Sequence, residues 1–214
     1  LFTKVLFLSD EIACQLITFK FGILTTFTIF IISKQYFSCK TGLYSALIFY
    51  SLPLTTELNT GAMTEHAGNF LTVLSVWFII LIFEKQNYNK RYLFFISGLL
   101  AGCGGATKIW ALLGAPAIFI LIIYLCYING LNIRKVTIFL FLFCLGYFVI
   151  LSPWFLRNYI ASGNPLWPLG YHFFDTQYWN EIIVQKMNNW SRGPQSNFLN
   201  YITGLWSLTN QIGA

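Results

Sequence analysis

Charged residues are scarce in this sequence. Only 9% of its 214 residues are Asp, Glu, Lys or Arg, while 57% are hydrophobic. An ordinary soluble domain carries about 25% charged residues, and a chain with so few would precipitate from water. The composition therefore excludes a soluble enzyme or binding module and predicts a protein embedded in lipid.

Motifs for metals, disulfides and nucleic acids are also missing. The net charge is +6, but the basic residues lie in short segments between apolar runs and form no basic face, so we expect no nucleic-acid partner. His66 and His172 are far apart in the sequence, and no CxxC spacing occurs. The histidines and cysteines therefore supply no motif for a metal site or a disulfide framework. The five cysteines are Cys14, Cys39, Cys103, Cys126 and Cys144.

Long apolar runs are abundant instead. A helix needs roughly 17–25 residues to cross about 30 Å of hydrocarbon. Six spans are predicted, at residues 12–33, 41–54, 67–83, 92–106, 109–128 and 136–152, and the last is expected to end at Pro153. The predicted fold class is an all-α, polytopic transmembrane helical bundle. Residues 1–152 form its transmembrane domain, 153–200 an interfacial segment of loops and short helices, and 201–214 the start of a further span.

The basic residues between the runs predict an orientation. They occupy alternate connections, which places them on one side of the membrane, and basic connections are typical of the cytoplasmic side. We therefore expect residues 153–200, which are rich in Trp, Tyr, Asn and Pro, on the non-cytoplasmic side. The basic residues concerned are Lys34, Lys40, Lys85, Lys90, Arg91, Arg134 and Lys135.

Small residues in the fourth predicted span suggest close helix packing. Gly98, Gly102 and Ala106 recur every four residues, which puts them on one helix face. Gly104 and Gly105 predict that the helix breaks just before Lys108 and turns this lysine inward.

Charges within or beside spans are candidate functional residues, because they are costly there. Lys20 lies inside the first span, although a lysine in such a place often extends to the interface. Glu57 and Glu65 flank a non-cytoplasmic connection, where a carboxylate can orient a sugar hydroxyl or act as a base, or is simply solvated. Lys108 and Arg157 lie at span ends, where a cation suits the phosphate of a lipid carrier or serves as an interfacial anchor.

Two segments carry a resemblance to a known family. Residues 153–168, PWFLRNYIASGNPLWP, resemble the P-W-x-x-R-N-x-x-x-x-G-N-P-x-x-P signature of bacterial GT-C glycosyltransferases. Upstream, GLLAG at 98–102 followed by ATK at 106–108 is similar to the family's G-L-x-x-G and T-K segments. Residues 11–36, 42–53 and 198–209 resemble further family segments. Together they resemble dolichyl-phosphate-mannose-protein mannosyltransferase-like enzymes and their bacterial relatives.

The resemblance implies transfer of a sugar from a polyprenyl-phosphate-linked donor to a glycan, lipid or protein acceptor on the non-cytoplasmic face. In the family the base is an Asp or Glu in the first large outer loop, so we expect it upstream of Leu1. The carboxylates in this chain that remain as weaker candidates are Asp10, Glu11, Glu57 and Glu65. A divalent metal cofactor is left open. The bacterial inner membrane is the expected location.

The implied substrate contacts fall on the matching motif positions. Lys108 and Arg157 are the candidate contacts to the carrier phosphate. Asn158 and Asn164 belong to the same predicted substrate-binding region, where they shape the loop around the Gly163-Asn164-Pro165 turn.

Two other function classes fit a polytopic chain. A transporter or lipid flippase predicts sequence repeats and charges near mid-membrane, and only Lys20 comes close to that position. A non-catalytic assembly subunit gives no reason for the aromatic segment after residue 153. A donor bound by a Rossmann-like domain is disfavoured, because no Gly-rich phosphate loop follows a strand.

Overall fold

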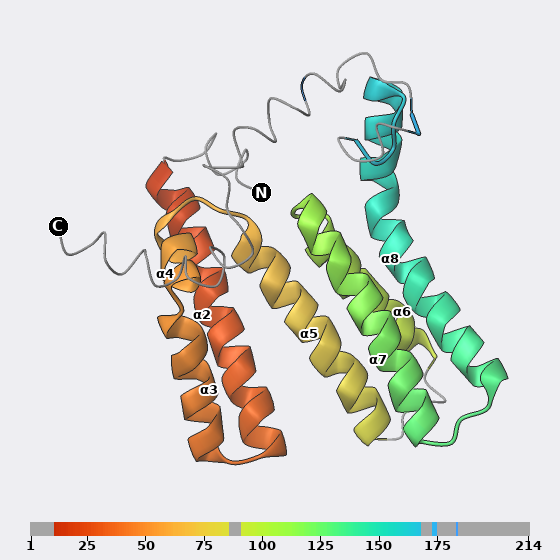
Figure 1. Cartoon of the computed structure of the whole chain (residues 1–214), viewed down its shortest axis with the longest axis horizontal. Helices are drawn as coiled ribbons and strands as arrows, with labels where there is room; N and C mark the ends of the chain where they lie inside the picture. Colours follow the sequence, from red (N-terminus) through yellow and green to blue (C-terminus); the bar gives the residue numbers. More distant parts are fainter. Residues whose placement is uncertain (1–10, 86–90, 168–172, 175–182, 184–214) are drawn as a thin grey trace, which may run out of the picture. The chain divides into compact units, whose positions relative to one another are not determined.

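The computed structural model describes residues 11–85, 91–167, 173–174 and 183 (Figure 1). Every regular element in these residues is a helix, which confirms the predicted all-α class. The chain divides into two compact units, Leu1–Trp154 (unit 1) and Phe155–Ala214 (unit 2), and each is described by itself. Most of the predicted interfacial segment after residue 167, and the span predicted to start at 201, lie outside the described residues.

Four helices in the described part of the chain are long and apolar enough to cross a membrane. They are α2 (Glu11–Tyr36), α5 (Glu65–Glu84), α7 (Gly114–Ile128) with the end of the preceding 3-10 helix η1 (Ile109–Leu113), and α8 (Ile133–Ser162). Their surfaces agree with a lipid environment, since Tyr127 and Ile133 are 82% and 78% exposed. The protein is an integral membrane helical bundle.

The second and fourth predicted spans are short helices, close to their predicted lengths. The helices α3 (Cys39–Ser51) and α6 (Tyr92–Gly105) have 13 and 14 residues. Each is about 20 Å long, less than the hydrocarbon thickness of about 30 Å. The end of α3 follows from Pro53, which holds Leu52 extended and opens the short helix α4 (Pro53–Thr60). Paired glycines end α6. The six predicted spans therefore correspond to four long helices and two short ones in the described residues.

The prediction that Pro153 ends the last span is wrong. The helix α8 continues through Pro153 to Ser162, so residues 153–162 are helical. A proline removes the N–H that would bond the carbonyl four residues earlier, here Val149. The Ser152 hydroxyl donates a 3.0 Å hydrogen bond to that carbonyl, which satisfies the freed acceptor.

Small and polar side chains hold the centre of unit 1 together. Ser75 on α5 and Ser97 on α6 are fully buried, and their hydroxyls lie 2.9 Å apart. On another face of α6, a Cβ built on Gly98 would lie 2.1 Å from the Phe143 carbonyl oxygen of α8. A Cβ on Gly146 of α8 would lie 2.2 Å from the Phe95 oxygen. The predicted small-residue face is therefore a close helix-packing surface, as is usual in membranes.

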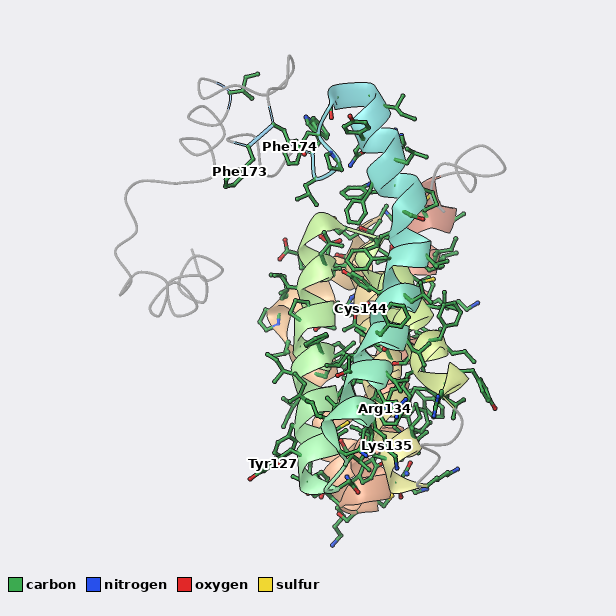
Figure 2. All side chains as sticks on the ribbon, turned by 90° about the vertical axis from the view of Figure 1, so that its right-hand side faces the viewer. Tyr127, Arg134, Lys135, Cys144, Phe173 and Phe174 are labelled. Carbon is green, nitrogen blue, oxygen red and sulfur yellow. The ribbon has the colours of Figure 1, made fainter. Side chains whose placement is uncertain are left out.

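The connections of unit 1 lie at two ends. The α2–α3 and α7–α8 connections, the end of α5 and the start of α6 lie at one end (Figure 1). Figure 2 shows Arg134 and Lys135 near Tyr127 there. Lys34, Lys40, Lys85 and Arg91 belong to the same end, which we call the basic end. The opposite end carries the α4–α5 and α6–η1 connections.

Candidate active site

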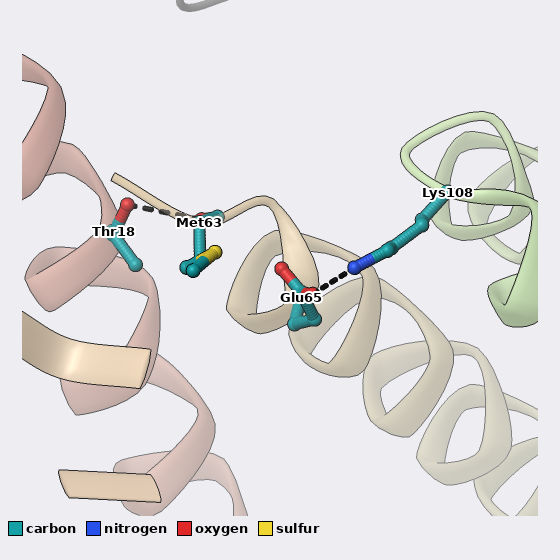
Figure 3. Close-up of polar contacts among 4 residues, drawn as sticks. All are labelled: Thr18, Met63, Glu65 and Lys108. Carbon is teal, nitrogen blue, oxygen red and sulfur yellow. Dashed lines mark hydrogen bonds and ion pairs between the residues drawn. The ribbon is translucent and has the colours of Figure 1, made fainter. Parts of the chain in front are cut away.

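An ion pair joins two of the predicted candidates at the end opposite the basic end. Glu65 is the first residue of α5, and Lys108 precedes η1. The Lys108 ammonium donates to Oε1 of Glu65 (Figure 3). The Glu65 side chain is 25% exposed and the Lys108 side chain 44% exposed, so the pair is partly shielded and still accessible to a ligand. The position of Glu65 at a helix N-terminus also favours its negative charge.

Lys108 reaches Glu65 because α6 ends in glycines. After Gly105 the chain leaves the helix, and Lys108 is extended, with φ −158° and ψ 146°. The Thr107 hydroxyl donates a 2.7 Å hydrogen bond to the Gly104 carbonyl and fixes the turn. The predicted helix break before Lys108 is therefore confirmed.

Glycines also bring α5 and α6 close at this end. A Cβ on Gly104 would lie 3.2 Å from the Gly68 carbonyl oxygen, and a Cβ on Gly68 would lie 2.6 Å from Thr107 Oγ1. The missing side chains let the α6–η1 connection rest against the first turn of α5. This contact carries Lys108 toward Glu65.

Contacts to α2 and α4 fix the start of α5 from the other side. His66, directly after Glu65, is 1% exposed, and its Nε2 lies 3.3 Å from the Thr55 carbonyl oxygen of α4. Thr18 of α2 donates a 3.0 Å hydrogen bond to the Met63 carbonyl oxygen (Figure 3). The backbone on either side of Glu65 is thus held by two different helices.

Three buried polar atoms near the ion pair have no hydrogen-bond partner among the described residues. They are Oε2 of Glu65, Nδ1 of His66 and Oδ1 of Asn59. Asn59 fits against α2 only because Gly22 lacks a side chain, since a Cβ there would lie 2.1 Å from Asn59 Oδ1. A buried polar atom without a hydrogen-bond partner destabilises the fold unless water or a ligand bonds to it. These three atoms therefore mark this end of unit 1 as a candidate site.

The other predicted contacts lie in unit 2. Arg157 is an exposed residue of α8, and its guanidinium has no ion pair among the described residues. The Asn158 amide donates to the carbonyl oxygens of Pro165 and Trp167, both at 3.4 Å. Asn164 is fully buried, and its Oδ1 accepts a 2.9 Å hydrogen bond from the Leu166 N–H. Both asparagines therefore hold the turn after α8, where Gly163 has φ 72°.

The remaining carboxylates are less engaged. Glu57 was expected in a connection but is an exposed residue of helix α4. Asp10 lies outside the described residues, and Glu11 is the first residue of α2. No group of three or more His, Cys, Asp or Glu side chains that could hold a metal ion occurs in the described ranges.

Sequence reasoning did not find the supporting residues Thr18, Asn59 and Gly22. Their roles depend on contacts across some 40 residues, for which a single sequence carries no signal. The close contact of the buried Asn59 with Gly22 becomes apparent only in the structure.

The comparison with known families decides which kind of protein carries this site. A family model described as dolichyl-phosphate-mannose-protein mannosyltransferase matches residues 1–156. The chain belongs to this family. No curated protein and no solved structure was found to match it.

As a member of the mannosyltransferase family, the protein is a membrane glycosyltransferase, and the resemblance drawn from its motifs is confirmed. The matched residues include both Glu65 and Lys108. Arg157, Asn158 and Asn164 follow directly after the matched range. The ion pair therefore lies in the part of the chain that shares the family's sequence pattern.

Proposed function

We propose that the protein transfers a sugar from a polyprenyl-phosphate-linked donor to a membrane-associated acceptor on the non-cytoplasmic side, with Lys108 contacting the donor phosphate. The observation that carries this proposal is the Glu65–Lys108 pair within the region matched by the mannosyltransferase family. A bacterial inner membrane is the proposed location.

The distribution of charge supports the proposed side of the membrane. Lys34, Lys85 and Arg91 belong to the basic end, with Arg134 and Lys135. Basic connections face the cytoplasm in most polytopic proteins. Glu65 and Lys108 belong to the opposite end, which supports a site that opens to the non-cytoplasmic face.

Lys108 has the chemistry for a departing phosphate. An ammonium group has three donors, so Lys108 can keep its contact with Glu65 and still offer two N–H groups to a phosphate oxygen. A cation in a partly shielded position stabilises negative charge that develops on a leaving group more than one in water does. The exposure of 44% leaves the Lys108 side chain open to such a ligand.

Glu65 acts through Lys108 in this proposal. One of its oxygens accepts from the lysine, and the other is buried, which leaves no open oxygen to take a proton from an acceptor hydroxyl. A carboxylate in this position holds the ammonium in place. Glu65 is therefore not the proposed base, and Asp10, Glu11 and Glu57 remain the weaker candidates for that role in this chain. Arg157 is retained as a second proposed phosphate contact.

The test is a transfer assay with the full-length protein in liposomes. Radiolabelled sugars are offered on polyprenyl phosphates and, separately, on nucleoside diphosphates, with acceptors supplied on one side at a time. We expect transfer from the polyprenyl-phosphate donors alone, to acceptors on the side of Glu65. Transfer from nucleotide sugars would contradict the donor. Movement of the lipid across the bilayer without transfer would favour a flippase.

A further inference from the structure

A membrane-exposed face of α2 carries an unusual combination of residues. Ile12, Leu16 and Phe19, then Ile23 and Phe27, recur at spacings of three and four residues, which places them on one face of the helix. Most are well exposed, with Leu16 at 62% and Phe27 at 57%. We call this surface the α2 face.

Two grooves follow the α2 face. The first, of about 450 Å³, is lined on α2 by Ile12, Gln15, Leu16 and Phe19 and bordered by Asn59 and Thr60 of α4. The second, of about 420 Å³, lies farther along α2 between residues 23 and 30 and is bordered by Leu43, Ala46 and Tyr50 of α3. Thr26 lines it too, but its hydroxyl is bonded to the Gly22 carbonyl at 2.9 Å. The first groove is therefore apolar with three polar residues in its lining, Gln15, Asn59 and Thr60, and the second is almost wholly apolar.

A lone cation stands between the two grooves. Lys20 is four residues after Leu16 and three before Ile23, so it borders the α2 face. It is exposed and has no ion pair or hydrogen bond within the described ranges. A charge on the lipid-facing side of a span is costly and needs an anion or water. Helical side chains lean toward the helix N-terminus, and the first groove lies in that direction from Lys20.

We infer that the α2 face binds a polyprenyl phosphate, with the phosphate beside Lys20 in the first groove and the isoprenoid chain along the second. This inference rests on the proposed function, because it takes the donor's carrier lipid as the occupant. The polarity matches such a lipid, since one anionic group is followed by a long apolar chain.

Length distinguishes this occupant from an ordinary phospholipid. In the proposed pose the phosphate lies at the level of Leu16, about one helical turn before Lys20. From there to Phe30 is about 21 Å along the helix. One leaflet of hydrocarbon is about 15 Å thick. The second groove thus continues past the middle of the bilayer, where an acyl chain from the same leaflet ends and a longer isoprenoid chain goes on.

The α2 face does not include the Glu65–Lys108 pair, but Asn59, which borders the first groove, lies near both. Thr18, which bonds the Met63 carbonyl next to that pair, is buried on the other side of α2. The lipid on the α2 face is therefore held at a surface outside the ion pair, as a carrier awaiting or leaving the reaction.

Photolabelling tests the inference. The full-length protein in phosphatidylcholine vesicles is irradiated with a photoactivatable polyprenyl phosphate, and the labelled peptides are mapped. We expect label on α2 and α3, and about fivefold less in Lys20→Ala, the effect of one lysine on an anionic lipid. Lys40→Ala, which removes an exposed cation at the basic end, is the matched control and should label normally.

A second pair of variants tests the apolar groove. Ala46→Trp fills the second groove and should lower labelling of α3. Ile120→Trp places the same side chain on the exposed surface of α7 and should not lower it. Unlabelled polyprenyl phosphate should compete, and polyprenol of equal length or phosphatidylglycerol should compete weakly. Equal competition by phosphatidylglycerol would overturn the inference in favour of general anionic lipid, and unchanged labelling in Lys20→Ala would overturn it outright.

The same samples separate this inference from the proposed function. If Lys20→Ala lowers the labelling of a protein that transfers no sugar, the lipid-binding site on the α2 face is supported and the proposed glycosyl-donor function is contradicted. Sugar transfer with no labelling of α2 or α3 would keep the enzyme and overturn the site.

Discussion

One added methyl group at Gly68 tests how the ion pair is positioned. A Cβ there would lie 2.6 Å from Thr107 Oγ1, well inside normal contact distance. The Thr107 hydroxyl is held by its 2.7 Å hydrogen bond to the Gly104 carbonyl, so it cannot turn away without losing that bond. Gly68→Ala should therefore push the α6–η1 connection away from α5 and destabilise the protein by about 1–3 kcal/mol, the usual cost of overpacking.

The reasoning also predicts a rescue. Thr107→Ala removes the clashing oxygen and alone should cost about 0.5–1.5 kcal/mol for its lost hydrogen bond. The double variant should be more stable than the sum of the single effects by about 1 kcal/mol or more. Because Lys108 follows Thr107 directly, its contact with Glu65, and transfer activity with it, should recover in parallel.

The assay is unfolding in mixed micelles, with sugar transfer measured on the same preparations. Gly130→Ala is the control, because Gly130 has φ 62° and no atom within 4 Å of an added Cβ. Gly130→Ala should lower the free energy of unfolding because alanine is strained at a positive φ, and Thr107→Ala should not restore the lost stability. Strictly additive losses in Gly68→Ala/Thr107→Ala would refute the proposed contact.

Three further predictions concern the bundle and its orientation. Ser75→Ala should destabilise the protein by about 0.6 kcal/mol, measured by unfolding in micelles, because it removes a buried hydrogen bond between α5 and α6; no loss would mean that the serine pair is replaced by other contacts. Gly98→Ala should cost at least about 1–3 kcal/mol in the same assay, since its Cβ would meet the Phe143 carbonyl, and wild-type stability would contradict the packing. In intact cells an impermeant maleimide should label Met63→Cys but not the exposed Cys39, and the reverse pattern would invert the topology.

The sequence predicted the helices better than their ends. Apolar runs are a strong signal for membrane helices, and a helix was found at each predicted span. The Gly104-Gly105 pair correctly located the break before Lys108, because a glycine pair weakens a helix by itself. The prediction that Pro153 ends the helix was wrong, because the hydrogen bond from the Ser152 hydroxyl to the Val149 carbonyl lets the helix continue. Neither Ser152 nor Pro153 alone reveals that compensation.

The site was only half visible in the sequence. Glu65 and Lys108 were each candidates because charges beside spans are costly, but their pairing joins positions 43 residues apart. That contact depends on the close approach of α5 and α6 at Gly68, which is a tertiary fact. The assignment of Arg157 to the donor phosphate stays a prediction.

The donor kinetics of Lys108→Ala test the central claim most directly. Loss of a charged contact to phosphate is worth about 1.5–3 kcal/mol, so kcat/KM for a polyprenyl-phosphate sugar should fall roughly 10- to 100-fold. Lys85→Ala, which removes a cation at the basic end, should leave it unchanged, and Glu65→Gln should act in the same direction as Lys108→Ala but more weakly. Wild-type kcat/KM in a folded Lys108→Ala protein would contradict the account, as would a larger loss in Glu65→Gln than in Lys108→Ala.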